Sequence, residues 1–424
     1  MPTTTSIPNT ADPGMTRDEC LALDAEDSLA FARARFVMPE GVIYLDGNSL
    51  GALPATTRAR LDVVMVREWG EDLIQSWNKG GWIDLPARLA KRIAPIIGAG
   101  EDEVIAADST SVNLFKLAAA ALTHQSPRRV ILTERDNFPT DLYVLHGLQA
   151  MLGGAVELKM VARDELFASL DDSVALLALT HIDYKTGEIH DMAAINAAAH
   201  RAGALTLWDL SHSAGAVELA LDRDGADLAI GCGYKYLNGG PGAPAYLFVA
   251  RHLQDALTQP LSGWMGHASP FEFSQSYRPA NGMLRFLSGT PVVLGMAALE
   301  EGLKTFDGIA MRDVQAKACA LGDLFLSLIE SQCGDAGFTI ACPRDAVRRG
   351  SQVSLRHPEG YAIMQALIEA GAIGDFRAPD VLRFGFAPLY TRYVDVFDAV
   401  AKLAGIMQRG TWRHARFGVR AAVT

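Results

Sequence analysis

Residues 204–242 read ALTLWDLSHSAGAVELALDRDGADLAIGCGYKYLNGGPG and place an acid and a lysine after two predicted strands. Leu205–Trp208 is a short apolar run that ends at Asp209, and a second run, 227–231, leads to Lys235. Open α/β sheets bind ligands at the carboxyl ends of their strands, so Asp209 is a candidate site residue. Lys235 lies among tyrosines and glycines, where restricted access of water would lower its pKa and make it a usable amine nucleophile toward an aldehyde.

Two interpretations of this acid and lysine are open. Pyridoxal phosphate requires two groups from a protein: an acid that keeps its pyridine nitrogen protonated and a lysine that forms an imine with its aldehyde. The alternative is that Asp209 caps a helix and Lys235 is a solvated loop lysine, and each residue taken singly favours it. Their order in the chain and the flanking tyrosines and glycines favour the cofactor site.

Composition narrows the class of protein. A chain of 424 residues, 49% hydrophobic and 21% charged, is long enough for two or three lobes. The net charge of −11 and the lack of a basic run with interleaved aromatics exclude a large nucleic-acid footprint. Five scattered cysteines without C-x-x-C indicate neither disulfides nor zinc, and we expect no metal site. The N-terminus lacks a signal-like segment and no apolar stretch reaches about 18 residues, so we expect a cytoplasmic protein that does not bind membranes.

Strands and helices alternate between about residues 100 and 250. Apolar, β-rich runs at 104–107, 130–133 and 175–180 are followed by segments of helical character, such as 112–122 and 192–202. This alternation predicts a mostly parallel sheet covered by helices on both faces. A Rossmann dinucleotide-binding fold is the rival, but no G-x-G-x-x-G follows the first strand.

The junction after the first of these strands is a candidate phosphate site. The sequence DSTS at 108–111 precedes the helix, so free N–H groups, hydroxyls and the positive end of the helix dipole would meet there. An ordinary Ser/Thr N-cap is the alternative. The next strand delivers NFPTD, residues 137–141, to the same edge, where Phe138 would stack on a heterocycle.

Three further segments carry candidate ligand-binding residues. The turn DGNSLG at 46–51 has the glycines expected at the rim of a site. The loop SWNKGGW at 76–82 holds two tryptophans, which either line a pocket for a flat ligand or pack the loop. Arg383 is flanked by apolar residues with period two, so it faces either solvent or a pocket, where a guanidinium would bind a carboxylate.

The character of the chain changes near residue 295, where long helices replace the alternation. We therefore predict four segments, namely a disordered tail (1–16), an N-terminal segment that packs with the small domain (17–60), a large α/β domain (61–294) and a small α+β C-terminal domain (295–424).

These motifs together resemble the kynureninase family, within the fold-type I, aminotransferase-like pyridoxal phosphate enzymes. The resemblance spans about residues 18–424 and becomes looser over 268–274, the lid loop. It rests on YLDGNSLG (44–51), NFPTDLY (137–143), WDLSHSAGA (208–216), YKYLNGGPG (234–242), LSGWMGH (261–267) and RFGFAPLY (383–390). A segment such as WDLSHSAG alone would match several relatives, whereas the combination is specific.

The resemblance implies a fold and a set of residue roles. The fold is α/β, with a mostly parallel sheet of the seven-stranded type flanked by helices, plus a smaller α+β C-terminal domain. Three residues are implied to be catalytic: Lys235 carries the imine, Asp209 binds the pyridine nitrogen and Tyr234 donates a proton. The implied cofactor contacts are Thr110, Ser111 and Tyr234 at the phosphate, Phe138 on the ring, and Asp141, Thr180, His212, Trp264 and Thr290 around it. Thr290 reaches the site from the neighbouring subunit of a homodimer.

Substrate contacts are implied for Arg383, which binds the α-carboxylate, and for Trp77, Asn48 and Ser49. The implied reaction is hydrolytic cleavage of the Cβ–Cγ bond of L-kynurenine to anthranilate and L-alanine, in tryptophan catabolism and NAD biosynthesis. Relatives that favour 3-hydroxykynurenine have a histidine where this chain has Trp77, so we expect a preference for kynurenine.

Three rivals remain on sequence grounds. An aminotransferase or cysteine desulfurase has the same fold, but a desulfurase needs a mobile nucleophilic cysteine, and none of the five lies in a polar Gly/Ser loop. A non-catalytic regulator that binds the cofactor would carry a basic DNA-binding module, for which the chain has no spare segment. A cofactor-free interaction protein is the third, and a missing cofactor absorbance band would favour it.

Overall fold

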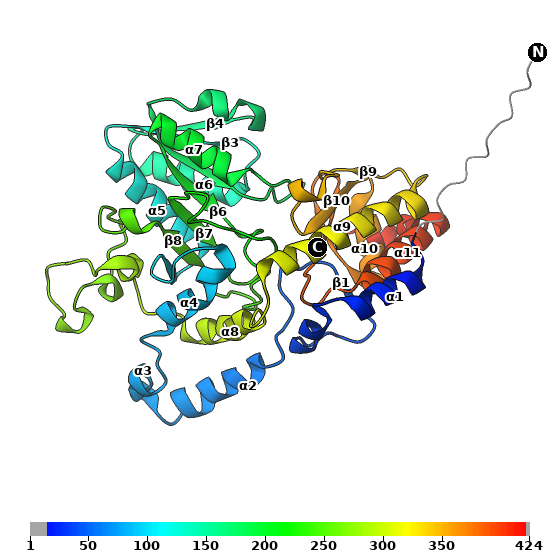
Figure 1. Ribbon diagram of the computed structural model, residues 1–424, viewed down its shortest axis with the longest axis horizontal. Helices are drawn as coiled ribbons and strands as arrows, with labels where there is room; N and C mark the ends of the chain where they lie inside the picture. Colours follow the sequence, from blue (N-terminus) through cyan, green and yellow to red (C-terminus); the bar gives the residue numbers. More distant parts are fainter. Residues whose placement is uncertain (1–14, 421–424) are drawn as a thin grey trace, which may run out of the picture.

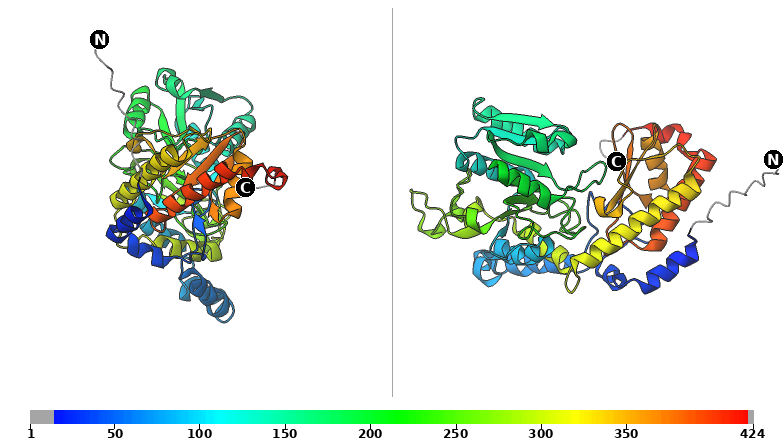
Figure 2. Two further views of the ribbon diagram at one scale, coloured as in Figure 1. Left: turned by 90° about the vertical axis from the view of Figure 1, so that its right-hand side faces the viewer. Right: turned by 45° about the horizontal axis from the view of Figure 1, so that its top comes forward.

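The computed structural model describes residues 15–420, which form two lobes (Figure 1). The expected tail at residues 1–16 therefore lies outside the described residues, except for Met15 and Thr16. The long helix α9 (Met311–Cys333) runs from one lobe to the other (Figures 1 and 2). None of the helices in the described part is long and apolar enough to cross a membrane.

The large lobe is built on a seven-stranded sheet with the order β2-β8-β7-β6-β5-β3-β4. Its strands are β2 (Val104–Ala106), β3 (Val130–Glu134), β4 (Glu157–Val161), β5 (Val174–Thr180), β6 (Leu205–Asp209), β7 (Leu228–Gly231) and β8 (Tyr246–Val249). Strands β4, β3, β5, β6 and β7 pair in parallel, and β8 is antiparallel to β7 and β2. The prediction of a mostly parallel sheet is confirmed.

Helices cover this sheet because its central strands are apolar on both faces. All residues of β5, β6 and β7 are buried. The helices of the lobe are α4 (Leu85–Ile97), α5 (Thr110–His124), α6 (Pro139–Met151), α7 (Met192–Ala202) and α8 (Val293–Lys304). The mostly parallel order brings the carboxyl ends of β3, β5, β6 and β7 to one edge, which positions the candidate site.

The small lobe contains a four-stranded antiparallel sheet with the order β12-β13-β10-β9. Its strands are β9 (Thr339–Ile340), β10 (Gln352–Arg356), β12 (Asp375–Arg377) and β13 (Val381–Gly385). The helices α1 (Arg17–Glu26), α9, α10 (Gly360–Glu369) and α11 (Tyr393–Arg409) pack around it. Helix α11 ends where Gly410 takes a left-handed conformation at φ 66°, which glycine adopts without steric cost.

The N-terminal segment contributes to both cores. Cys20, Ile43 and Leu45 belong to the core of the small lobe, and Ile43 lies in β1 (Ile43–Tyr44), which pairs in parallel with β11 (Ala372–Ile373). Leu29, Ala32 and Phe36 join the core of the large lobe. Helix α9 also contributes residues to both cores. The expected domain boundary at residue 295 stays a prediction.

Residues 57–79 form an arm that projects below the large lobe (Figures 1 and 2). The arm consists of α2 (Thr57–Asp62), a π-helical stretch (Val63–Trp69), a short 3₁₀ turn and α3 (Ser76–Lys79). The expected loop at 76–82 is therefore helical in its first half. Large apolar side chains of the arm are exposed, among them Val66 at 63%, Trp69 at 60% and Ile74 at 76%.

Candidate active site

A cavity of about 270 Å³ opens at the carboxyl ends of the parallel strands. Thr180 and Asp209 are the last residues of β5 and β6, and Lys235 follows four residues after the end of β7. Nine of the predicted site residues line the cavity, namely Thr110, Ser111, Phe138, Asp141, Thr180, Asp209, His212, Tyr234 and Lys235. The residues are far apart in sequence, and the strand order brings them together.

Lys235 is held at the cavity by a tightly packed backbone. The N–H of Gly51 donates to the carbonyl of Tyr234 at 2.8 Å, and a Cβ at Gly51 would lie 2.3 Å from the carbonyl oxygen of Lys235. Only glycine fits there, which explains one glycine of the turn 46–51. Nζ of Lys235 lies 5.9 Å from the centre of the Phe138 ring. Burial lowers the pKa of Lys235, so a larger fraction of the amine is unprotonated than at a surface lysine.

Asp209 is a buried carboxyl group, 6% exposed, at the end of β6. Its Oδ1 accepts the N–H of Ser211 at 2.7 Å. Burial raises the pKa of Asp209, and it also raises that of Asp141, to which the charge of Asp209 adds. A cation bound between these groups would stabilise the ionised form of Asp209. This is the environment that a protonated ring nitrogen requires.

The N-terminus of α5 forms the polar end of the cavity. Ser109 is the N-cap and accepts the N–H of Val112 at 3.3 Å, so the N–H groups of Thr110 and Ser111 are free of intrahelical bonds. Asp108 would repel an anion here, but its carboxylate is paired with the fully buried ammonium of Lys116. The helix end is therefore suited to a phosphate group.

His212 supplies a further polar atom that lacks a partner. Within residues 15–420, its buried Nδ1 has no hydrogen-bond partner, and His212 is one of the residues that line the cavity. Burial lowers the pKa of His212 well below its usual value, so the ring is neutral. An orphaned imidazole nitrogen, a buried acid, a lysine and a free helix N-terminus around one cavity fit pyridoxal phosphate.

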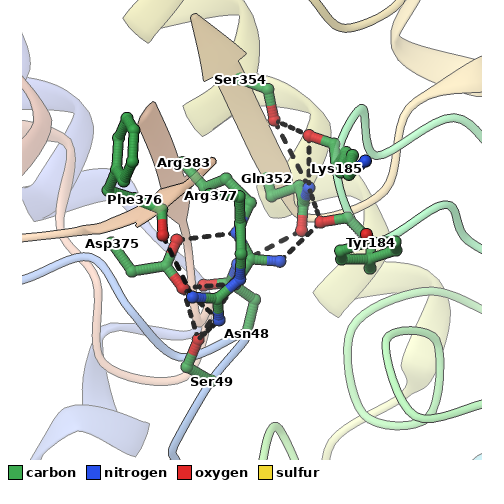
Figure 3. A network of polar contacts seen from close by, with 10 residues as sticks. All are labelled: Asn48, Ser49, Tyr184, Lys185, Gln352, Ser354, Asp375, Phe376, Arg377 and Arg383. Atoms are coloured by element: carbon green, nitrogen blue, oxygen red, sulfur yellow. Dashed lines mark hydrogen bonds and ion pairs between the residues drawn. The ribbon is translucent and has the colours of Figure 1, made fainter. Parts of the chain in front are cut away.

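Three of the predicted substrate-binding residues lie beside the cavity in a buried polar network (Figure 3). Arg383 is 1% exposed, and its Nη1 donates to the carbonyl oxygen of Tyr184 at 2.5 Å. Nη2 of Arg383 donates to Oγ of Ser49 at 3.2 Å, and Nδ2 of Asn48 donates to Oε1 of Gln352 at 3.3 Å. Arg383 therefore does not face solvent, the first of the two alternatives that the sequence left open, and it lies beside the cavity without lining it.

The other three predicted residues do not line the cavity of the described chain. Trp77 lies on the arm, with its ring edge-on to Trp82 at 6.2 Å between centroids. Trp264 packs edge-on to Phe271 at 5.6 Å, and Thr290 is exposed. The roles of Trp77, Trp264 and Thr290 stay predictions.

Tyr184 lines the cavity, and the sequence analysis missed it. Its ring meets that of Phe138 edge-on, 5.1 Å between centroids. The signal was present, because Tyr184 follows the carboxyl end of β5 by four residues, the same position that Lys235 has after β7. Asp375, which binds both Arg383 and Arg377, and Arg377 itself were also missed, and no local pattern marks them.

Comparisons with known proteins show which family this chain resembles. Residues 314–403 match the family described as the kynureninase C-terminal domain. The chain is 51% identical over 414 residues to the kynureninase of Pseudomonas fluorescens, covering 96% of this chain and all of that protein. A kynureninase of Burkholderia mallei (strain SAVP1) matches with the same identity and coverage.

Solved structures show the fold. A cysteine desulfurase from Thermococcus onnurineus NA1 superposes with a TM-score of 0.75 at 19% identity, covering 90% of this chain and 98% of that one. A mutant of the cystine C-S lyase C-DES, with glycine linked to its PLP cofactor, gives 0.74 at 17% identity, covering 88% and 98%. The predicted fold-type I architecture is thus confirmed. Identity of 51% over nearly the whole length, together with the matched C-terminal domain, shows that this chain belongs to the kynureninase family.

Proposed function

We propose that this protein uses pyridoxal phosphate to hydrolyse the Cβ–Cγ bond of L-kynurenine, giving anthranilate and L-alanine. The observation that carries the proposal is the convergence of Lys235, Asp209 and the N-terminus of α5 on one cavity. The chain in which they converge is 51% identical to kynureninases over 96% of its length.

The lining residues suggest how the cofactor would be held. Thr110, Ser111 and Tyr234 would bind its phosphate, Asp209 its ring nitrogen, and Phe138 would lie against its ring, with Asp141, Thr180 and His212 around it. When bound, pyridoxal phosphate supplies an electron sink for negative charge that develops on the substrate. Asp209 would keep the ring nitrogen of the bound cofactor protonated, which would strengthen this electron sink.

Lys235 and Tyr234 would move the protons. The lowered pKa of Lys235 makes its amine available as the base that removes the α-proton of the substrate. Burial raises the pKa of the Tyr234 hydroxyl, so it keeps its proton at neutral pH and would donate it to the β-carbon. Water adds to the γ-carbonyl and the Cβ–Cγ bond breaks, so anthranilate leaves with the oxygen of that water. The β-carbon takes the proton of Tyr234 and becomes the methyl group of alanine, Lys235 returns a proton to the α-carbon, and the proton released by the water restores Tyr234.

We further propose a homodimer in the cytoplasm. The exposed apolar residues of the arm, including Trp69 and Ile74, form the kind of surface that a second subunit covers. Trp77 on the same arm, and the exposed Thr290, would then reach the neighbouring cavity. Light scattering on the cofactor-loaded protein tests this assembly. If the protein is a monomer at micromolar concentration, Trp77 and Thr290 do not contribute to the cavity of a neighbouring subunit.

The reaction is tested by incubating the cofactor-loaded protein with L-kynurenine. Anthranilate fluorescence should rise together with an equal amount of L-alanine, and the Lys235→Ala variant is the control. L-Cysteine in place of kynurenine tests the desulfurase rival, which the structure disfavours because, within the described residues, none of the five cysteines lines the cavity. Sulfide from cysteine without anthranilate from kynurenine would overturn the proposal.

A further inference from the structure

Two arginines beside the cavity share one aspartate (Figure 3). Asp375 in β12 lies directly opposite Arg383 in β13, and Arg377 is two residues further along β12, on the same face as Asp375. Nε of Arg383 donates to Oδ1 of Asp375 at 2.7 Å, and its Nη2 binds Oδ2. Nη2 of Arg377 lies 2.8 Å from the same Oδ2. One carboxylate thus holds two guanidinium groups side by side.

Arg383 by itself has little positive charge left for an incoming anion. Its Nε–Nη2 edge is occupied by Asp375, and the two side chains form a buried ion pair, each 2% exposed. Burial acts to raise the pKa of Asp375, but the hydrogen bonds and charges of Arg383 and Arg377 outweigh it and lower that pKa, so the carboxylate is ionised. The pair of Arg383 and Asp375 is therefore electrically neutral.

Arg377 supplies the positive charge that the neutral pair lacks. Its side chain is 36% exposed, so it is more accessible than Arg383. Its other contacts are neutral and longer: Nη1 donates to the carbonyl of Phe376 at 3.2 Å and Nη2 to Oγ of Ser49 at 3.5 Å. Two guanidinium groups and one carboxylate leave a charge of +1, which one substrate carboxylate would neutralise.

A second acid, Asp46, lies in range of this cluster and would cancel that charge if it were fully ionised. Burial raises the pKa of Asp46 to about 7, and the charge of Asp375 adds to the effect. Asp46 is therefore largely neutral below pH 7. An anion bound at the arginines would favour its protonated form further, so below pH 7 Asp46 opposes binding little.

Both guanidinium groups act on the cavity. The charges of Arg383 and Arg377 each lower the pKa values of Lys235 and His212, which line it. Tyr184 connects the two regions, because its carbonyl oxygen accepts a hydrogen bond from Arg383 and the residue also lines the cavity. A ligand amine at Lys235 would thus place its neighbouring carboxylate toward both arginines.

We propose that Arg377 is a second carboxylate-binding residue, and that Asp375 holds Arg377 and Arg383 as a paired receptor for the α-carboxylate of the substrate. The inference rests on the proposed function only in taking an amino acid as the ligand. Arg377 and Arg383 together, rather than Arg383 alone, would then select amino acids over amines that lack the carboxylate.

The test compares two ligands that differ only in the carboxylate. Cofactor-loaded protein is titrated with L-alanine and with L-alaninamide, and dissociation constants are read from the cofactor absorbance. Arg377→Gln should lower the preference for L-alanine about ten- to a hundredfold, the effect of losing a charged hydrogen-bond partner. Arg377→Lys, which keeps the charge without the fork, should retain part of the preference. With L-kynurenine, KM should rise and kcat should change by less than about threefold.

Arg356→Gln is the matched control. Arg356 lies in β10 of the same lobe, is 47% exposed and pairs with Asp380, so its loss changes the net charge equally without touching the cluster. If Arg377→Gln does not fold, Arg377→Met, which keeps the apolar stem, replaces it. A preference within twofold of the wild type in the Arg377 variants overturns the inference. If the wild-type protein binds L-alanine more tightly than L-alaninamide but releases no anthranilate from L-kynurenine, the proposed reaction is wrong and the carboxylate-binding role of the two arginines is still supported.

Discussion

Asp375 and Arg383 face each other across the antiparallel strands β12 and β13, with Oδ1 of Asp375 2.7 Å from Nε of Arg383. Both side chains are 2% exposed, so neither charge has water as an alternative partner. Removing one member of such a pair leaves a buried charge, which costs more than the pair itself contributes. Arg383 therefore has a structural role in addition to the one proposed in substrate binding.

Arg383→Ala should affect both stability and substrate affinity. We expect the free energy of unfolding to fall by about 3 kcal/mol, since Arg377 still pairs with Asp375, and KM for L-kynurenine to rise at least about tenfold with the cofactor absorbance unchanged. Urea denaturation and steady-state kinetics measure the two effects. The double variant Arg383→Met/Asp375→Leu should recover stability but not KM. Recovery of both would move the carboxylate site elsewhere.

Lys235→Ala should reduce turnover by at least about a thousandfold, because it removes the amine that binds the cofactor and moves the α-proton. Borohydride reduction of the wild type should attach the cofactor to the peptide that contains Lys235, as mass spectrometry would show. Lys304→Ala is the control, since Lys304 pairs with Glu301 outside the cavity. Label on Lys185 or Lys304 would contradict the assignment.

Asp209→Asn should leave the fold intact, because the amide oxygen can still accept the N–H of Ser211 that Oδ1 now accepts at 2.7 Å. An amide cannot hold the ring nitrogen protonated, so kcat should fall by orders of magnitude while the melting temperature changes little. Kinetics and thermal denaturation on the loaded variant measure both. Activity within about tenfold of the wild type would exclude this role for Asp209.

Trp77 is expected to set the preference between L-kynurenine and its 3-hydroxy derivative. Its single N–H can only donate, and a ring hydroxyl pressed against the indole would lose water without a partner, at about 1–3 kcal/mol. We expect kcat/KM to favour L-kynurenine about ten- to a hundredfold, and Trp77→His to reduce the ratio. Trp69→His, on the same arm and 60% exposed, is the control. A ratio that Trp77→His leaves unchanged would mean that Trp77 only packs against Trp82.

His181 should make the protein sensitive to acid. Its Nδ1 lies 2.8 Å from Oγ of Ser213, and burial lowers its pKa from 6.5 to about 3. Between these values the unfolded chain binds a proton at His181 that the folded chain does not, so stability present above pH 6.5 is lost as the pH falls. The loss approaches about 1.4 kcal/mol per pH unit.

The His181→Gln variant isolates this effect, because glutamine keeps a hydrogen-bonding group near Ser213 but does not titrate. Its free energy of unfolding should fall less steeply than that of the wild type between pH 6.5 and 5.0, by about 1–2 kcal/mol in total. Urea denaturation at these two pH values measures the difference. Parallel curves would show that His181 is not buried in the neutral form.

The sequence by itself determined the sheet and most of the cavity. Apolar runs that end in polar residues mark the carboxyl ends of strands, and parallel strands present those ends at one edge, so local patterns alone group Asp209 and Lys235. Thr180, at the end of another such run, was implied by the family resemblance. The same rule would have included Tyr184. These inferences succeed because they depend on local periodicity and on a property shared by all parallel sheets.

Only the tertiary structure decided how Arg383 is used. Period-two flanks place it in a strand, but its partner depends on the register of β12 against β13, which puts Asp375 opposite it and Arg377 beside it. Trp77 is a second example. Its sequence motif predicted an aromatic loop, but only the packing of the arm shows that Trp77 lies against Trp82 and does not line the cavity of its own chain. The local sequence pattern determines which residues are buried. Which segment packs over them depends on contacts between parts of the chain that are distant in sequence.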